Sequence, residues 1–346
     1  MYAYNLSLVD VSGRFHTEVM PADASTTSSS RTLRTILITG GTSGIGLAAA
    51  KSVLQSEGPW HVIVANRDAT RARPAVADLR KAARAGNTVE SLSVDLASLA
   101  AVRTFAADLV SRVTAGTLPP FHAVVCNAGV QAGASMTTTE DGFESSFGVN
   151  HLAHFLLIEE LRRVLAAPAR VVVVASDTHD PAMKAGVPVP AWSTARELAH
   201  GTLGPLASKD GAFVAGQRRY STSKLANIFY TYELARQLPE GVTANAFNPG
   251  LVPGTGLQRS APAPVRIIAK HILPRMTWLV RRVMTPNVHT TEESGSALAY
   301  LAIDPELSTT TGTYFDGRTP IPSSEESYDA AKAAELWATS EALVRA

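Results

Sequence analysis

Short apolar runs and longer segments with helical spacing alternate along most of this chain. Six runs are short and rich in apolar or β-branched residues, as buried strands are, and they lie at 36–39, 61–65, 122–126, 170–175, 242–247 and 312–315. A seventh run, at 89–94, alternates between apolar and polar residues, as a strand also does. Helical composition or spacing follows at 47–54, 68–85, 98–113, 151–167, 218–238, 292–303 and 328–343. Strands that alternate with helices through short connections are typical of a parallel sheet covered on both faces. The pattern therefore predicts an α/β fold with a doubly wound sheet of about seven strands.

The first thirty residues stand apart from this alternation. They end in the small, polar run PADASTTSSS, which predicts a disordered extension for 1–30. A weak alternation around Leu6, Leu8 and Val11 would alternatively suit a short added strand. The remaining residues, 31–346, show no internal repeat and no shift in composition, so we expect them to form a single domain.

The composition is ordinary for a globular protein with a sizeable core, with 45% hydrophobic residues among 346. A formal net charge of +1 provides no basic field, so we expect no nucleic-acid partner. Cys126 is the only cysteine, which excludes an intramolecular disulfide and fits a reducing cytoplasm. The chain lacks an apolar stretch of about 18 residues and a secretory signal pattern, so we expect no membrane span. We predict a soluble cytoplasmic protein without a metal site.

The stretch 35–46, read as TILITGGTSGIG, joins the first predicted strand to the first predicted helix. Free N–H groups and the helix dipole make such a helix N-terminus a seat for an anionic pyrophosphate. Gly40, Gly44 and Gly46 would allow the tight turn, the close approach of phosphates and the packing of helix on strand. The spacing differs from the commonest dinucleotide pattern, and alone the turn could also be purely structural.

Tyr220 and Lys224 lie four residues apart in a predicted helix, so their side chains share one face. A tyrosine in water has a pKa of about 10, which is too high for acid–base work at neutral pH. An adjacent ammonium favours the phenolate and lowers that pKa, which would make the tyrosine a workable general acid or base. The alternative is an exposed pair on a helix without a catalytic role.

The chain carries an ordered set of motifs: the glycine turn, Asn127-Ala128-Gly129, Asn150, Ser176, and Tyr220 with Lys224. From about residue 34 to 315 this set resembles the short-chain dehydrogenase/reductase family. The resemblance implies a Rossmann-type fold, hydride transfer, and Tyr220 as the proton donor. It implies that Ser176 hydrogen-bonds the substrate oxygen, that Lys224 lowers the pKa of Tyr220 and binds the nicotinamide ribose, and that Asn150 holds a proton-relay water. A helix cap is the alternative role for both Asn150 and Ser176.

In this family the dinucleotide lies over the glycine turn and the carboxyl ends of the strands. The residues to which the resemblance assigns cofactor binding are Gly40, Thr42, Ser43, Gly44, Ile45, Gly46, Asn66, Arg67, Asp95, Leu96, Asn127, Ala128, Gly129, Tyr220, Lys224, Pro249, Gly250, Val252 and Thr255. The threonine usually found four residues after the Pro-Gly glycine is displaced here, since Gly254 occupies that position and Thr255 follows it.

The end of the second strand bears on the choice of cofactor. An acidic residue there would accept hydrogen bonds from the ribose of NAD and repel a 2′-phosphate. This chain has Asn66 and Arg67 at that point, and an arginine can pair with phosphate through two parallel hydrogen bonds. Asp68 comes one residue later, where it would cap the next helix. We therefore predict NADP(H) in preference to NAD(H).

Three strings resemble one branch of the family, that of retinol dehydrogenases and light-dependent protochlorophyllide reductases: NHLAHFLL from Asn150, the Ser176-x-x-His179 spacing, and the run SSEESYDAAKAAELWATSE. The second of these enzymes carries two cysteines where this chain has Ala226 and Leu251. The resemblance implies a related enzyme acting on a carbonyl or alcohol of an apolar small molecule. A C=C reductase like protochlorophyllide reductase and a non-catalytic NADP-binding sensor or scaffold are the alternatives.

Two irregular segments, 177–219 and 251–290, interrupt the pattern, and in the family such segments cover the substrate. The second contains 264–284, where basic and apolar residues are mixed. We expect this stretch to act as a lid or to pack between subunits, with a peripheral membrane contact as the alternative. Family members are often homodimers or homotetramers built on paired helices, here within 139–167 and 218–238.

Overall fold

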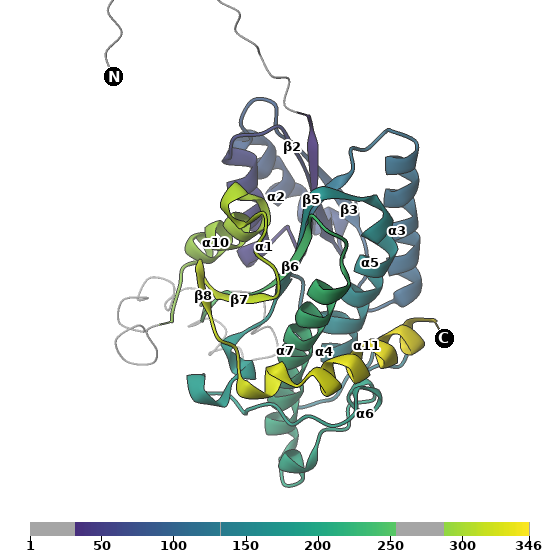
Figure 1. Cartoon of the computed structure of the whole chain (residues 1–346), viewed down its shortest axis with the longest axis vertical. Coiled ribbons are helices and arrows are strands. Elements are labelled where there is room, and N and C mark those ends of the chain that lie inside the picture. Colours follow the sequence, from purple (N-terminus) through teal and green to yellow (C-terminus); the bar gives the residue numbers. More distant parts are fainter. Residues whose placement is uncertain (1–31, 132, 254–286, 346) are drawn as a thin grey trace, which may run out of the picture. The chain divides into compact units, whose positions relative to one another are not determined.

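An eight-stranded sheet runs through the computed structural model, which describes residues 32–131, 133–253 and 287–345 (Figure 1). Its strands in chain order are β1 (Arg34–Thr39), β2 (Trp60–Asn66), β3 (Thr88–Ser93), β4 (Phe121–Cys126), β5 (Leu165–Val174), β6 (Val242–Asn248), β7 (Thr313–Asp316) and β8 (Thr319–Ile321). They lie in the order β3-β2-β1-β4-β5-β6-β7-β8, and every neighbouring pair is parallel except β7 with β8. The predicted doubly wound sheet is confirmed, and β8 adds an antiparallel edge strand that the sequence pattern did not indicate.

Helices cover both faces of this sheet (Figure 1). They are α1 (Gly44–Gln55), α2 (Ala69–Ala82), α3 (Leu99–Thr114), α4 (Ser145–Phe147), α5 (Ala153–Leu161), α6 (Ala195–Ala199), α7 (Ala212–Gln237), α10 (Thr291–Ile303) and α11 (Ala330–Arg345). Residues of β1 alternate between the two layers, because successive side chains of a strand point to opposite faces. Ile36 and Ile38 join the core under α1, α2 and α10, whereas Leu37 joins the core under α3, α5, α7 and α11.

Two helices begin with a capping side chain, and the first of these caps, Asp68, was expected from the sequence. The Asp68 carboxylate accepts hydrogen bonds from the backbone N–H groups of Thr70 and Arg71 at the start of α2. The Ser98 hydroxyl accepts one from the backbone N–H of Ala101 at the start of α3. Both side chains satisfy donors that the first helical turn leaves without partners. Asp68 is therefore a cap.

The predicted helix 151–167 is wrong at both ends. The chain forms a five-residue π-helix at Gly148–Leu152, then α5, then a 3₁₀ turn, and it becomes extended at Leu165. Pro168 explains the early end, because proline lacks an N–H and disfavours helical backbone in the residue before it. The apolar run that suggested a longer helix is therefore divided between α5 and β5.

The irregular segment 177–219 is more ordered than its composition suggested. It contains α6, which starts with a capping box between Thr194 and Glu197, and its last eight residues already belong to α7. The catalytic-helix candidate thus begins at Ala212, six residues before the predicted start. The segment 251–290, by contrast, lies almost wholly outside the described residues, as do Thr255 and residues 1–30.

The helix α11 packs back across α7 and α5 (Figure 1). Its Trp337 ring meets Phe155 of α5 at a centroid distance of 5.0 Å and Tyr230 of α7 at 5.8 Å. The Ser340 hydroxyl lies 2.8 Å from Nε2 of His151. An aromatic cluster of the chain's own residues thus occupies the face where α5 and α7 meet.

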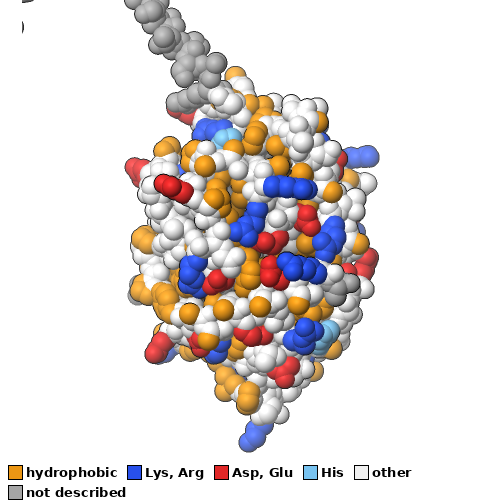
Figure 2. All heavy atoms as spheres, turned by 45° about the vertical axis from the view of Figure 1, so that its right-hand side comes forward, with side chains coloured by type: hydrophobic (Ala, Val, Ile, Leu, Met, Phe, Trp, Pro, Cys, Tyr) orange, Lys and Arg blue, Asp and Glu red, His pale blue; other side chains and the backbone are white. Residues whose placement is uncertain are grey.

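Acidic and basic side chains are interspersed on the face shown in Figure 2, and neither sign dominates it. Across residues 32–131, 133–253 and 287–345, no helix is long and apolar enough to cross a membrane.

Candidate active site

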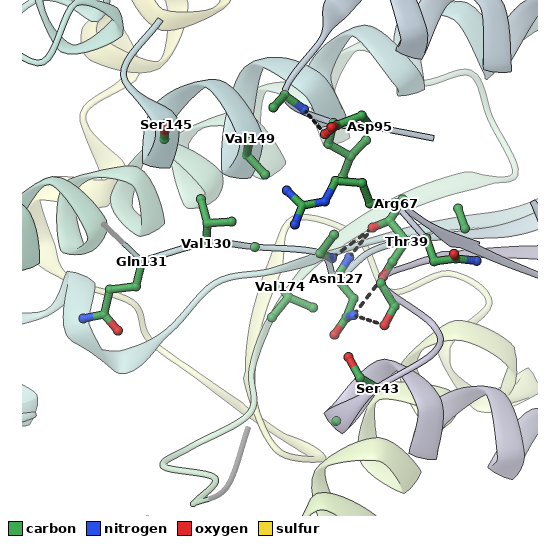
Figure 3. Close-up of a pocket in the computed structure, with 18 of the residues that line it drawn as sticks. Thr39, Ser43, Arg67, Asp95, Asn127, Val130, Gln131, Ser145, Val149 and Val174 are labelled. Carbon is green, nitrogen blue, oxygen red and sulfur yellow. Dashed lines mark hydrogen bonds between the residues drawn. The ribbon is translucent and has the colours of Figure 1, made fainter. Parts of the chain in front are cut away.

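A cavity of about 830 Å³ opens at the carboxyl ends of β1, β2, β4 and β5, with α1 on one side and α7 on another (Figure 3). Ligands of doubly wound folds bind at this edge of the sheet, and the volume is typical of a cofactor site. The predicted site residues that line it are Gly40, Thr42, Ser43, Gly44, Ile45, Asn66, Arg67, Asp95, Leu96, Asn127, Ala128, Gly129, Tyr220, Lys224 and Pro249. The structure therefore brings most of the predicted residues to one space.

The N-terminus of α1 faces this cavity without a side-chain cap. Ser43 is the cap residue but accepts no hydrogen bond from the helix, and the first turn contains no acidic residue. Gly40 and Gly44 adopt the left-handed conformation, with φ angles of +68° and +53°, which side chains other than glycine rarely tolerate. Gly46 does not line the cavity: a Cβ there would come within 2.5 Å of the Asn127 amide nitrogen. The turn thus presents free N–H groups to the cavity, as an anion site requires.

Thr39, at the end of β1, ties the glycine turn to the end of β4. Its hydroxyl oxygen accepts hydrogen bonds from the backbone N–H groups of Asn127 (2.9 Å) and Ala128 (3.0 Å). In return, the Asn127 side-chain amide donates to the Thr39 carbonyl at 2.8 Å. These contacts hold two adjacent loops of the cavity floor together (Figure 3).

Two arginines line the cavity near the end of β2. Arg67 is exposed and extends into the open space (Figure 3). Arg71 also lies against the Asp68 carboxylate, at 3.1 Å. The Asn66 amide points the other way, donating to the Ser91 hydroxyl on β3 at 2.8 Å. Arg67 is therefore the side chain of this group best placed to meet a ligand's charge.

Tyr220 and Lys224 both line the cavity from α7 and are both buried. The Lys224 ammonium lies 5.5 Å from the centroid of the Tyr220 ring and donates to the Val174 carbonyl at 2.9 Å. Burial lowers the pKa of Lys224 to about 8. Burial also raises the pKa of Tyr220, and the Asp177 carboxylate adds to this, while a hydrogen bond with the Ser176 side chain opposes it. The pKa of Tyr220 therefore shifts in the direction opposite to the one expected from the Tyr220–Lys224 spacing, and desolvation is the largest cause.

Ser176 follows β5 and reaches Tyr220 through its side chain. Its hydroxyl donates to the Asp177 carboxylate at 3.1 Å and accepts from the backbone N–H of Thr178, so it also caps a short 3₁₀ turn. The cap and the contact with Tyr220 are thus compatible. His179 fixes the turn, because its Nε2 accepts from the backbone N–H of Ser324 while Nδ1 donates to the Ser176 carbonyl at 2.6 Å.

Asn150 lies in the π-helix and is fully buried. Its side chain does not cap a helix: it accepts from the Val130 N–H at 2.8 Å and donates to the Val130 carbonyl and the Ser223 hydroxyl, both at 3.0 Å. Ser223 belongs to the same helix as Tyr220. Asn150 therefore clamps the loop after β4 to the helix that carries the tyrosine.

The Pro249–Gly250 turn closes another side of the site. Gly250 has a φ of +69°, and the Pro249 carbonyl accepts from the Ser294 hydroxyl of α10 at 2.8 Å. Val252 is buried, and neither it nor Gly250 is among the described cavity-lining residues. Since Thr255 lies outside the described residues, its predicted contact remains a prediction.

Sequence reasoning missed several residues here. Val130, Gln131, Thr137, Thr138, Ser145 and Val149 line the cavity, yet no motif distinguished them from neighbouring positions. Asp177 was also missed, although its place directly after Ser176 was a usable signal. Burial raises the pKa of its carboxyl group.

The sheet, its ligand cavity and the polar cluster on α7 are those of a doubly wound α/β protein with a site at its carboxyl edge. A family model described as short chain dehydrogenase matches residues 34–194. The WW domain-containing oxidoreductase of Danio rerio is 34% identical over 318 residues, covering 90% of this chain and 68% of that protein. The chloroplastic protochlorophyllide reductase B of Hordeum vulgare is 36% identical over 333 residues, covering 91% and 80%. The chain belongs to the short-chain dehydrogenase/reductase family, a family of oxidoreductases.

Solved structures share the fold. An uncharacterized protein from Mycobacterium paratuberculosis superposes with a TM-score of 0.60 at 27% identity, covering 90% of this chain and 93% of that one. A short chain dehydrogenase from Burkholderia cenocepacia, solved in complex with NADP, gives 0.55 at 24% identity, covering 82% and 95%. The family predicted from the motifs is confirmed, and protochlorophyllide reductases are among its relatives.

Proposed function

We propose that this protein is an NADP(H)-dependent oxidoreductase that transfers a hydride between nicotinamide and a carbonyl or alcohol of an apolar small molecule. The observation that carries the proposal is that one cavity is lined both by the uncapped N-terminus of α1 and by Tyr220 and Lys224. A seat for a dinucleotide and a group able to move a proton therefore face the same space.

The cavity residues fit a phosphorylated dinucleotide. The free N–H groups of α1 suit a pyrophosphate, and Arg67 with Arg71 would pair with a 2′-phosphate. The absence of an acidic residue at position 66 or 67 supports NADP(H), as does the NADP found in the Burkholderia cenocepacia neighbour of the same fold. NADPH, when bound, supplies the hydride.

The side chains of this chain would hold the substrate oxygen and move its proton. Tyr220 stays protonated at neutral pH because its pKa is raised, so it can donate to a carbonyl oxygen. Ser176, which already reaches Tyr220, would hydrogen-bond the same oxygen. Lys224 has three N–H donors, and the structure assigns one of them to the Val174 carbonyl, so the others could hold ribose hydroxyls. Asn150 would hold the water that returns a proton to Tyr220.

A C=C reductase is the second candidate, supported by the 36% identity to barley protochlorophyllide reductase. At the two positions where those enzymes carry cysteines, this chain has Ala226, which is fully buried, and Leu251, which pairs with Val288. Neither side chain can donate a proton. This difference favours carbonyl chemistry.

The test is a comparison of Tyr220→Phe with the unchanged protein. We expect carbonyl reduction, followed as loss of NADPH absorbance across a panel of apolar ketones and aldehydes, to fall on the order of 10²- to 10⁴-fold. The dissociation constant of NADPH, measured by fluorescence titration, should change little. Tyr232→Phe is the matched control, since that hydroxyl lies on the same helix but pairs with Ser323.

Unchanged turnover in Tyr220→Phe would contradict the mechanism. Tight NADPH binding without turnover of any carbonyl would favour a sensor or scaffold. Turnover restricted to protochlorophyllide under illumination would favour the C=C reductase.

A further inference from the structure

His154 is a buried histidine, 1% exposed, in the first turn of α5. Its Nε2 lies 2.9 Å from the Thr39 hydroxyl, and its Nδ1 lies 3.2 Å from the main-chain carbonyl oxygen of Asn150. Thr39 and Asn150 are separated by more than a hundred residues, and each belongs to a different part of the site. His154 is thus the side chain that joins them.

The Asn150 carbonyl determines which ring nitrogen carries the proton. A carbonyl oxygen can only accept, so Nδ1 carries the hydrogen and donates it to that oxygen. Nε2 of the neutral ring is then an acceptor, and it faces the Thr39 hydroxyl. The Val125 carbonyl, 3.3 Å from the same hydroxyl, is a second acceptor for its hydrogen. Burial lowers the pKa of His154 to about 4, which agrees with a neutral ring.

The hydrogen bonds continue on both sides of the ring. On one side, Thr39 holds the loop that begins at Asn127, beside the glycine turn. On the other, the Asn150 amide donates to the Ser223 hydroxyl, which donates to the Tyr220 carbonyl at 2.7 Å. A continuous series of buried groups therefore runs from the cofactor cavity's floor to the helix that carries Tyr220 and Lys224.

We propose that His154 is a positioning residue which, as the neutral Nδ1–H tautomer, holds the Asn150 carbonyl and the Thr39 hydroxyl in fixed relation, so that the cofactor floor and the proton-transfer groups stay aligned. The kinetic part of this inference rests on the proposed oxidoreductase function. The tautomer does not, because it follows from the hydrogen bonds alone.

The first experiment is NMR of protein labelled with ¹⁵N-histidine at neutral pH, in the absence of substrate. We expect a pair of signals typical of a neutral Nδ1–H ring that is lost in His154→Gln, and this loss distinguishes it from the pair of His179, which its own partners place in the same tautomer. A protonated ring, or the Nε2–H tautomer, would overturn the proposal whether or not the protein is an active reductase.

The second experiment separates positioning from packing through kcat and KM. His154→Phe removes both hydrogen bonds, and we expect kcat to fall and the KM for NADPH to rise, each by on the order of tenfold. His154→Asn keeps a donor near the position of Nδ1 but is too short to reach Thr39. We therefore expect it to recover most of kcat while the KM for NADPH stays high.

His151→Phe is the matched control, because this equally buried histidine pairs with Ser340 on α11 instead of the site. His151→Phe should lower the midpoint of unfolding, and it should not change kcat and the KM for NADPH independently of each other. The positioning role would be overturned if a folded His154→Phe variant had normal kcat and KM. It would also be overturned if the Phe and Asn variants lost activity equally, in proportion to the fraction of each protein that is folded. Absence of carbonyl turnover in every variant, together with the expected tautomer, would instead count against the proposed function.

Discussion

Burial determines the charge state of the two side chains on α7 that face the cavity. Lys224 gives up its proton more readily than in water, with a pKa of about 8, while Tyr220 holds its proton more tightly. Both shifts have the same cause, since a low-dielectric surrounding disfavours the charged form of either group. The protonated tyrosine is the form that can donate to a carbonyl.

These shifts predict the pH dependence of carbonyl reduction. Below pH 8 Lys224 is charged and Tyr220 is protonated, so kcat should be nearly constant, and it should fall as the pH rises through about 8 because Lys224 loses its charge. The measurement is kcat for NADPH-dependent reduction at a series of pH values. Lys224→Arg keeps the charge, so its residual activity should lack this decline. If kcat fell at the same pH in the unchanged protein and in Lys224→Arg, Lys224 would be excluded as the origin of the decline.

Arg67 predicts the preference between the two nicotinamide dinucleotides. Arg67→Ala removes a cation that would pair with the 2′-phosphate, so the KM for NADPH should rise about 10- to 100-fold while the KM for NADH changes little. Arg71→Ala is the control: it also lines the cavity, but it lies against Asp68 and should have a smaller effect. Steady-state kinetics with each cofactor provide the comparison. Equal changes for NADPH and NADH would contradict a phosphate contact.

At the scale of elements, α1 and α10 approach each other closely through small residues. A Cβ at Gly295 of α10 would overlap the Ala48 side chain and lie 2.8 Å from the Ala48 and Ala49 backbone. Backbone cannot move aside as a flexible side chain can, so the two helices would have to separate. Since α1 also provides the free N–H groups of the cavity, its position matters for the site as well as for the core.

Gly295→Ala should therefore destabilise the protein by about 1–3 kcal/mol through overpacking, measured by urea unfolding. It should also weaken NADPH binding if the shift reaches the N-terminus of α1. Gly211→Ala is the control, because nothing lies within 4 Å of its added Cβ and its φ is −67°. A loss of stability as large in Gly211→Ala as in Gly295→Ala would argue against a local clash.

Some of the helices and strands could be predicted from the sequence with their boundaries, and others could not. Most strands were found because short apolar or β-branched runs indicate burial, whereas β3, which has no fully buried residue, was found from its alternation. The end of α5 was not, because apolar spacing continued past it while Pro168 determined the boundary. The start of α7 was not either, because its first residues, 212–217, share the irregular composition of the segment before them. The strand β8 has only three residues, too few for a period to show.

The same distinction holds for the site. The glycine turn and the Tyr220–Lys224 spacing are local patterns, so they could be found in the chain alone. The direction of the Tyr220 pKa shift and the bond between His154 and Thr39 depend on residues far away in sequence, and nothing local indicates them.

At the scale of the whole molecule, the position of α11 bears on assembly. Dimers expected from the sequence would pair the helices α5 and α7, yet Trp337 and its neighbours pack against both. We predict that the protein is monomeric at micromolar concentration, as measured by sedimentation velocity. A dimer that persists on dilution, and that charged substitutions on the outer surface of α7 dissociate, would contradict this prediction.

The same contact has a consequence for how the protein is made. Ribosomes synthesise α5 and α7 well before α11, because Leu161 and Gln237 end the first two helices and Ala330 begins the third. During that interval Phe155 and Tyr230 lack the ring that later covers them, although both are at most 2% exposed in the finished fold. Nascent chains halted between α7 and α11 would therefore expose an aromatic surface to chaperones. This surface would be buried only after α11 has left the ribosome and packed against α5 and α7.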